Sequence, residues 1–254
     1  MKQTKIGFFD SGIGGVTVLR ECLRLNPNFE YFYYSDSIHN PYGDKSQNEI
    51  LSIIDSIVVQ LIQKGCFIIV IACNTASAIG VSYLREKYPD IIFIAIEPAI
   101  KLAYSNNCGS GTLIMATKGT MESEKFHSLY ELYHCLDFYL LPCVGLANLI
   151  EHGDMKTLHQ YLVKYLSSYK GRVSSVVLGC THYPIIKSEI KKILGDVAFY
   201  DGSLGVAQQL KRVILDNDFV GTGSKEILFF DSSKDNLKEK RFRELLEGNY
   251  ESYY

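Results

Sequence analysis

The sequence contains no apolar run long enough to cross a membrane. The longest apolar stretches, at 66–73 and 91–96, fall far short of the roughly 20 residues that a spanning helix needs. Basic residues are not in excess either, because 26 lysines and arginines are set against 28 acidic residues and the net charge is −2. Proteins that bind nucleic acid or an anionic membrane surface usually present a basic face. We therefore expect neither of these partners and favour a small-molecule ligand.

The cysteines lack the pattern of a disulfide-stapled or metal-binding fold. Their number, seven, is odd, and no pair is spaced C-x-x-C. The N-terminus has no apolar stretch followed by a small-residue cleavage site, so we expect a cytoplasmic protein without a signal peptide. The cytoplasm keeps thiols reduced, so the cysteines are expected to be free and no metal is expected.

What the sequence does contain is a regular alternation of short strand-like segments and longer helical patterns. With 47% hydrophobic and 21% charged residues, the 254-residue chain is long enough for two compact domains. The alternation predicts parallel sheets covered by helices, an α/β fold. The expected strands lie at 6–9, 31–34, 67–71, 91–96, 113–116, 138–141, 176–178 and 197–200. A helical pattern at 205–215, a strand at 226–230 and a charged segment at 234–247 follow them.

An internal repeat relates the two halves of the chain. The separation between Asp10 and Cys73 (73 − 10 = 63) equals that between Thr117 and Cys180 (180 − 117 = 63). The offset from the first pair to the second (117 − 10 = 107) also carries segment 30–32 onto 137–139. The repeat predicts two similar parallel-sheet α/β domains, related by pseudo-twofold symmetry. Cys73 and Cys180 would then lie on opposite walls of one cleft, which is the expected active site.

Small polar residues follow several of the expected strands. In open parallel sheets, ligands bind at the carboxyl ends of the strands. Cys73 and Cys180 each follow a strand and begin a turn toward a helix, where backbone N–H groups and the helix dipole favour an anion and lower the pKa of a thiol. The remaining cysteines are interpreted as small packed hydrophobes: Cys22, Cys66, Cys108, Cys135 and Cys143.

Two features invite a cofactor interpretation. The glycine run at 12–15 departs from the G-x-G-x-x-G pattern of dinucleotide-binding folds. Lys118 follows a strand, and a lysine there could form a Schiff base with pyridoxal phosphate. We favour the interpretation that it is a solvated turn lysine. No cofactor is therefore expected.

Four segments carry a specific resemblance. They are 7–15 (GFFDSGIGG), 40–43 (NPYG), 72–76 (ACNTA) and 178–184 (LGCTHYP), supported by 117–120 (TKGT) and 150–153 (IEHG). In order and spacing they resemble the aspartate/glutamate racemase family, and its glutamate racemases in particular. The resemblance implies cofactor-independent conversion of L-glutamate to D-glutamate for peptidoglycan synthesis, by a homodimer. It also implies a first domain of residues 1–97 plus 207–254 and a second domain of 98–206.

The resemblance assigns roles to residues of this chain. Inversion at the α-carbon removes a proton from one face and delivers one to the other, so a thiolate and a thiol would flank the carbon. Cys73 and Cys180 would be these two bases, with Asp10 beside Cys73 and with Glu151 and His182 beside Cys180. The residues expected to bind substrate are Asp10, Ser11, Tyr42, Gly43, Asn74, Thr75, Thr117, Thr120, Thr181 and His182.

Other functions remain open at this point. An aspartate racemase shares the fold and the mechanism, but relatives of that type tend to carry Glu two residues after the second cysteine, where this chain has His182. A Cys-His hydrolase would need one essential cysteine and would form a covalent adduct. A non-catalytic binding module would need neither cysteine.

Overall fold

Two parallel β-sheets form the framework of the protein in this computed structural model, which describes residues 2–107, 109–152, 154–221, 223–224 and 226–248. The strands of the first sheet follow the order β11-β3-β2-β4-β5, and every neighbouring pair is parallel. They are β2 (Lys5–Asp10), β3 (Tyr31–Ser35), β4 (Cys66–Ile71), β5 (Ile92–Ala95) and β11 (Ile227–Asp231).

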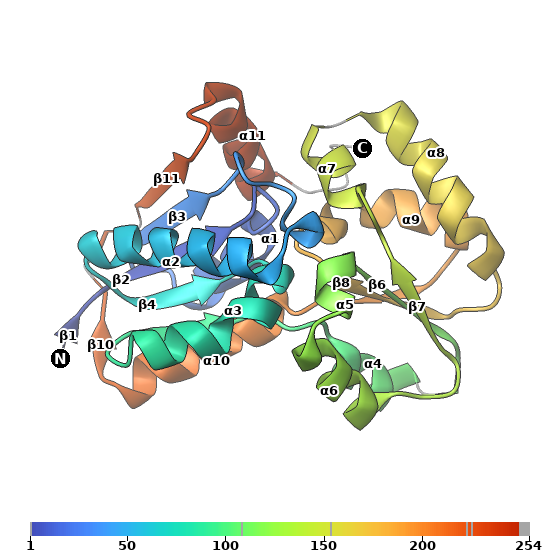
Figure 1. The fold of residues 1–254 in the computed structure, drawn as a ribbon, viewed down its shortest axis with the longest axis horizontal. Helices are drawn as coiled ribbons and strands as arrows, with labels where there is room; N and C mark the ends of the chain where they lie inside the picture. The colour runs from blue at the N-terminus through green and yellow to red at the C-terminus, as the bar shows by residue number, and fades with distance from the viewer. Residues whose placement is uncertain (1, 108, 153, 222, 225, 249–254) are drawn as a thin grey trace.

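The second sheet lies beside the first in a separate half of the molecule (Figure 1). Its strands follow the order β7-β6-β8-β9 and are also parallel. They are β6 (Thr112–Ala116), β7 (Phe138–Pro142), β8 (Ser175–Gly179) and β9 (Ala198–Tyr200). A small two-stranded sheet pairs β1 (Lys2–Gln3) with β10 (Phe219–Val220).

The two sheets repeat one arrangement. The order β3-β2-β4-β5 in the first sheet matches β7-β6-β8-β9 in the second. The start of β7 at Phe138 follows the start of β3 at Tyr31 by the offset expected from the sequence (138 − 31 = 107). The prediction of two similar parallel-sheet α/β regions is therefore confirmed. The division into residues 1–97 plus 207–254 and residues 98–206 stays a prediction, although β11 pairs with β3 in the first sheet.

Helices cover the sheets, and α2 (Gln47–Gln63) illustrates why they form. It begins at Ser46, whose side chain accepts a hydrogen bond from the Glu49 N–H while the Glu49 carboxylate accepts one from the Ser46 N–H. Its buried residues, including Ile50 and Ile54, recur at helical spacing and face the sheet. The other α-helices are α1 (Val16–Leu25), α3 (Asn74–Lys87), α4 (Ile100–Asn107), α5 (Lys118–Met121), α6 (Glu124–Tyr133), α7 (Leu146–His152), α8 (Met155–Leu166), α9 (Lys187–Leu194), α10 (Ser203–Asp216) and α11 (Asn236–Glu247). Short 3-10 helices lie at η1 (Tyr42–Asp44), η2 (Ser167–Tyr169) and η3 (Tyr183–Ile186).

One cluster of buried apolar side chains continues from the first half into the second. It includes Leu19 of α1, Leu210 of α10 and Ile185 of η3. The turn that follows Cys180 therefore packs against the same core as α1, which fixes its position relative to the first sheet. None of the helices in the described part of the chain combines the length and apolar character that crossing a membrane requires.

Candidate active site

The predicted acid–base residues lie at the carboxyl ends of strands in both sheets. Asp10 is the last residue of β2, Cys73 is the N-cap of α3 after β4, and Cys180 directly follows β8. Thr181 donates a hydrogen bond from its hydroxyl to the Asp10 carboxylate at 3.3 Å, which joins the two halves at this point. Both thiols are almost fully enclosed, since Cys73 is 5% exposed and Cys180 is 7% exposed.

The surroundings of Cys73 oppose its ionisation. Its sulfur lies 3.7 Å from the Ser11 hydroxyl, to which it donates. Burial and then the Asp10 charge raise the pKa of Cys73 to about 12, and a hydrogen bond from the Ala76 N–H only partly offsets them. The expectation of a lowered pKa at this helix N-terminus is therefore wrong, because enclosure and a neighbouring carboxylate outweigh the helix dipole.

Asp10 is fully buried and accepts hydrogen bonds from both halves. The N–H of Gly15 donates to its carboxylate at 2.9 Å, in addition to the Thr181 hydroxyl. Burial raises the pKa of Asp10 to about 6, although the positive charge of His182 and the Gly15 hydrogen bond act in the opposite direction. A carboxyl with this pKa exchanges a proton near neutral pH, as an acid–base group must.

Cys180 belongs to a chain of three titratable side chains. Its sulfur lies 3.9 Å from Nδ1 of His182, and Nε2 of the same ring lies 2.6 Å from Oε2 of Glu151. Burial lowers the pKa of His182, but the hydrogen bonds and charges of Cys180 and Glu151 outweigh it and hold the pKa well above the usual value. Burial likewise raises the pKa of Glu151, but His182 brings it below the usual value. The pair is thus an imidazolium and a carboxylate, with the cation beside Cys180.

The backbone after Cys180 differs from the expected helix start. Residues Tyr183–Ile186 form a 3-10 helix with Pro184 in its first turn, and α9 begins only at Lys187. Proline has no N–H, and so short a helix offers little dipole to an anion. The nearby positive charge at Cys180 therefore comes from His182.

Three threonine hydroxyls from the two halves meet beside Cys73. Thr75 Oγ1 lies 2.9 Å from that of Thr117 and 3.2 Å from that of Thr120, and the last two lie 2.9 Å apart. Thr75 is in α3 of the first half, whereas Thr117 caps α5 of the second. The side-chain oxygen of neighbouring Asn74 is buried and has no hydrogen-bond partner among the described residues. This group offers hydroxyl donors and a free acceptor of the kind that a carboxylate and an ammonium group need.

The Tyr42-Gly43 segment reaches the same junction. A side chain on Gly43 would lie 2.9 Å from Cβ of Thr117, so the glycine permits close contact with the second half. The Tyr42 hydroxyl is buried and donates to Asp36 at 2.6 Å. In this arrangement the backbone of the segment, rather than the Tyr42 hydroxyl, faces the threonine cluster.

Glycines in the first turn make room for the second half. A Cβ on Gly12 would lie 2.7 Å from an oxygen of Glu151, and one on Gly14 would overlap the His182 ring. The N–H of Ile13, between them, donates to the Glu151 carboxylate at 3.3 Å. The glycine run therefore permits close packing of Glu151 and His182 against the first turn.

Three residues that contact the candidate site were not identified from the sequence. Thr17 donates from its hydroxyl to the backbone oxygen of Thr181 at 3.2 Å and so supports the turn after Cys180. Lys238 and Arg241 of α11 contact Glu151 from the far end of the chain. Only the glycine spacing at 12–15 hinted that another segment packs closely here.

The other cysteines of the described ranges are buried in the core, and one of them is not a free thiol. Cys22, Cys66 and Cys143 are buried free thiols, and burial raises the pKa of each. Cys135 is disulfide-bonded, so the expectation that every cysteine is a free thiol is wrong. Which cysteines meet in space depends on the fold and not on their spacing in the sequence. Cys108 lies outside the described residues.

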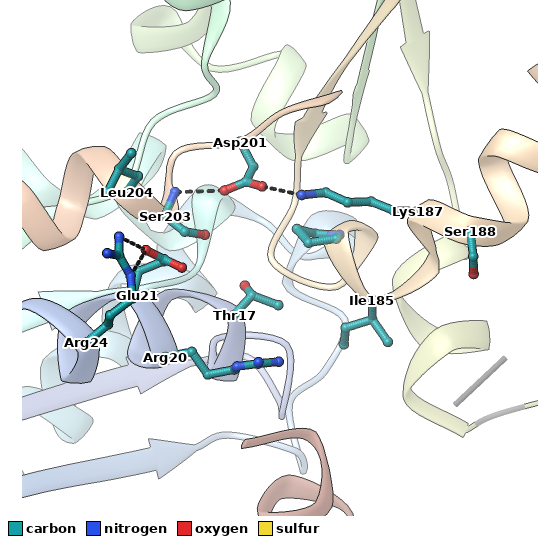
Figure 2. Close-up of a pocket in the computed structure, with 11 residues that line it drawn as sticks. Thr17, Arg20, Glu21, Arg24, Ile185, Lys187, Ser188, Asp201, Ser203 and Leu204 are labelled. Atoms are coloured by element: carbon teal, nitrogen blue, oxygen red, sulfur yellow. Dashed lines mark hydrogen bonds and ion pairs between the residues drawn. The ribbon is translucent and has the colours of Figure 1, made fainter. Parts of the chain in front are cut away.

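A separate pocket of about 620 Å³ opens behind the turn that follows Cys180 (Figure 2). Thr17 and Ile185 line it, and Lys187 forms an ion pair with Asp201 at its rim, 2.9 Å apart. The predicted site residues do not line this pocket. In the described ranges, no three His, Cys, Asp or Glu side chains are grouped to hold a metal ion. Lys118 is 58% exposed and faces Glu122, as a solvated turn lysine does.

Comparison with known proteins gives a consistent result. The family model described as Asp/Glu/Hydantoin racemase matches residues 19–210. A glutamate racemase of Clostridium perfringens is 42% identical over 252 residues, which cover 96% of this chain and 95% of that protein. The structure of glutamate racemase from Francisella tularensis in complex with D-glutamate superposes with a TM-score of 0.81, at 30% identity, covering 98% of this chain and 96% of that one. The Escherichia coli glutamate racemase, solved with L-glutamate and the activator UDP-MurNAc-ala, gives a TM-score of 0.82 at 26% identity, covering 99% and 95% of the two chains.

Proposed function

Because the chain belongs to the Asp/Glu/Hydantoin racemase family, we propose that it interconverts L- and D-glutamate without a cofactor, with Cys73 and Cys180 as the two bases. The choice of glutamate is supported by relatives named glutamate racemase at 42% identity over nearly the full length, and by the related structure solved with D-glutamate. His182, two residues after the second cysteine, supports glutamate over aspartate on the resemblance described above.

One observation carries the two-base proposal: the Asp10 carboxylate, whose charge acts on the Cys73 thiol, accepts a hydrogen bond from Thr181, the residue after Cys180. A thiolate at Cys180 raises the pKa of Cys73 further, beyond the effects of burial and Asp10. Two thiolates in one enclosed site therefore disfavour each other, so the pair should hold at most one negative charge. One thiolate and one thiol is the charge state that inversion requires.

The proposed reaction has two proton transfers. The thiolate on one face of the substrate removes the α-proton and becomes a thiol. The thiol on the other face then gives its proton to the α-carbon and becomes a thiolate, so the two cysteines exchange roles in each turnover. No covalent bond to sulfur forms, and the reverse reaction uses the same groups in the opposite order.

The side chains around the thiols would stabilise the charges of the substrate and the transition state. Imidazolium His182 places a positive charge 3.9 Å from the Cys180 sulfur. Asp10 can accept a hydrogen bond from the substrate ammonium group or hold a proton near neutral pH. The threonine cluster and nearby backbone N–H groups would hold the carboxylates, and the Asn74 side-chain oxygen would accept from the ammonium group.

Cellular parts of the proposal depend on the family resemblance. D-Glutamate made by this reaction would supply peptidoglycan synthesis, and with it cell wall biogenesis and cell shape. The chain would work in the cytoplasm as a homodimer, without nucleic acid or membrane partners. Light scattering of the purified protein measures its mass in solution. The mass of a dimer is expected, and the mass of a monomer would contradict this part of the proposal.

A direct assay tests the activity. The purified protein, with no added cofactor, is incubated with L-glutamate and separately with L-aspartate while optical rotation is followed. Loss of rotation with glutamate is expected, and no change would refute the proposal; faster loss with aspartate would reassign the substrate. Cys73→Ala and Cys180→Ala should each abolish racemisation, and full activity in either variant would exclude the two-base mechanism.

A further inference from the structure

Helix α11 places two cations on the end of α7 that carries Glu151. Nζ of Lys238 lies 3.9 Å from Oε1 of Glu151, and its side chain is only 24% exposed. The guanidinium of Arg241 donates to the backbone oxygens of Glu151 at 2.5 Å and Ile150 at 2.7 Å. Figure 1 shows α11 in the first half, next to α7 of the second. We propose that Lys238 and Arg241 are positioning residues that hold Glu151, and through it His182, in the arrangement that Cys180 needs for the racemisation proposed above.

The spacing of residues along α11 supports the positioning role of its two cations. Arg241 and Phe242 follow Lys238 by three and four residues, and Leu245 follows them by four and three, so all four residues share one face of the helix. Phe242 and Leu245 are fully buried, and the Phe242 ring lies 4.7 Å from the Tyr33 ring of β3. The apolar part of this face therefore anchors α11 to the first half, while its two cations extend to α7.

The Tyr33 side chain links this anchor to the active-site turn. Its hydroxyl donates to the backbone oxygen of Gly12 at 2.9 Å, next to the Ile13 N–H that contacts Glu151. Glu151 is thus held from the first half by a backbone N–H and by Lys238, in addition to its pairing with His182. Its position depends on both halves.

The two cations should act in different ways. Lys238 faces the carboxylate and favours its charged form, which in turn favours the imidazolium form of His182. Arg241 faces the last carbonyl groups of α7, which a cation and hydrogen-bond donor stabilise. Lys238 should therefore set the pH range of activity. Arg241 should set the geometry of the series Glu151, His182 and Cys180.

Three other titratable side chains interact with Glu151. His182 is hydrogen-bonded to it, and Asp10 interacts with its charge across the junction. The charge of Glu151 also raises the pKa of the buried Tyr33. A substitution at position 238 leaves these three side chains in place, so a shift of the pH profile reports the loss of the Lys238 charge.

The test compares Lys238→Met with Lys240→Met in the full-length protein. Lys240 lies on the same helix and has an ion pair of the same length, 3.9 Å, but it is 74% exposed and its partner is Glu244 of α11, which makes it a matched control. The pH profile of kcat/KM is measured for the native enzyme and both variants, with Lys238→Arg as the rescue. Without Lys238 the Glu151 carboxylate takes up a proton at higher pH, so the acid limb should move up by about one pH unit. Lys240→Met and Lys238→Arg should keep the native profile.

Arg241→Gln tests the second cation. It should lower kcat about tenfold at every pH, because the end of α7 loses a charged donor and Glu151 shifts. Coincident profiles for Lys238→Met and Lys240→Met in an active enzyme would overturn the role of Lys238, and native kcat in Arg241→Gln would overturn that of Arg241. An inactive native enzyme would instead overturn the proposed function, and this inference with it.

Discussion

Gly14→Ala should damage the active site although it adds only one methyl group. The new Cβ would overlap Nδ1 of His182 and lie 2.7 Å from Cγ and Cε1 of the same ring. An ordinary contact needs at least about 3.4 Å, so the ring or the turn must move by more than about 0.7 Å. His182 is 1% exposed and its other nitrogen is held 2.6 Å from Glu151, which leaves it little freedom to adjust. Gly14 has no positive φ, so alanine meets no backbone strain there and the effect comes from the contact alone.

A displacement of this size at an acid–base group should lower kcat tenfold to a hundredfold, since about 1 Å of misplacement costs about 10²-fold. Overpacking should also lower stability by about 1–3 kcal/mol. Gly205→Ala is the control, because no atom lies within 4 Å of its added Cβ in α10; it should raise stability by about 0.5–1 kcal/mol and leave kcat unchanged. Optical rotation assays and urea unfolding measure both effects. Native kcat in Gly14→Ala would refute the packing argument for His182.

Three further substitutions test other parts of the site and its scaffold. The pKa of Asp10 is raised to about 6 in the folded protein, so its contribution to stability is present below pH 4 and is lost as pH rises through 6. Asp10→Asn should therefore be more stable than the native protein at pH 8, by up to about 3 kcal/mol in urea unfolding, with a smaller gain at pH 5 and with loss of racemisation. Equal stability at pH 8 would contradict the buried charge. His182→Asn should lower kcat about 10²-fold because Cys180 loses its neighbouring cation, and a native rate would exclude that role. Ser46→Ala should cost about 1 kcal/mol of stability through loss of the α2 cap, without any change in kcat.

The strands and the repeat were predictable because their signals are local. Apolar runs such as 67–71 and 113–116 became β4 and β6, since a strand buried on both faces of a parallel sheet has no polar alternation. The constant offset between the two copies of the repeat then related the strands of one sheet to those of the other. These two features, together with the family resemblance, led us to expect Asp10 and Thr181 at one junction, where the structure joins them by a hydrogen bond.

The electrostatics of the thiols could not be predicted in the same way. A helix N-terminus is visible in the sequence, but the pKa of Cys73 is raised by burial in the core of the first half and by the charge of Asp10, both of which depend on the tertiary fold. The 3-10 helix after Cys180 arises from Pro184 and from packing against α1, both of which displace the helix start. The contact of Lys238 with Glu151 joins residues that lie far apart in the sequence, and nothing in the charged segment at 234–247 indicates which element it packs against.

The central claim, inversion by two cysteines on opposite faces, is tested most directly by the origin of the α-hydrogen. L-Glutamate is incubated with the enzyme in deuterated water, and the reaction is stopped before one-tenth of the substrate has been converted. The deuterium content is then measured separately in the D-glutamate formed and in the remaining L-glutamate. The second cysteine exchanges its proton with solvent, so the product should carry deuterium while the remaining substrate stays largely unlabelled. D-Glutamate that retains the original hydrogen of the substrate would show that one base returns the same proton, which would contradict the two-cysteine mechanism.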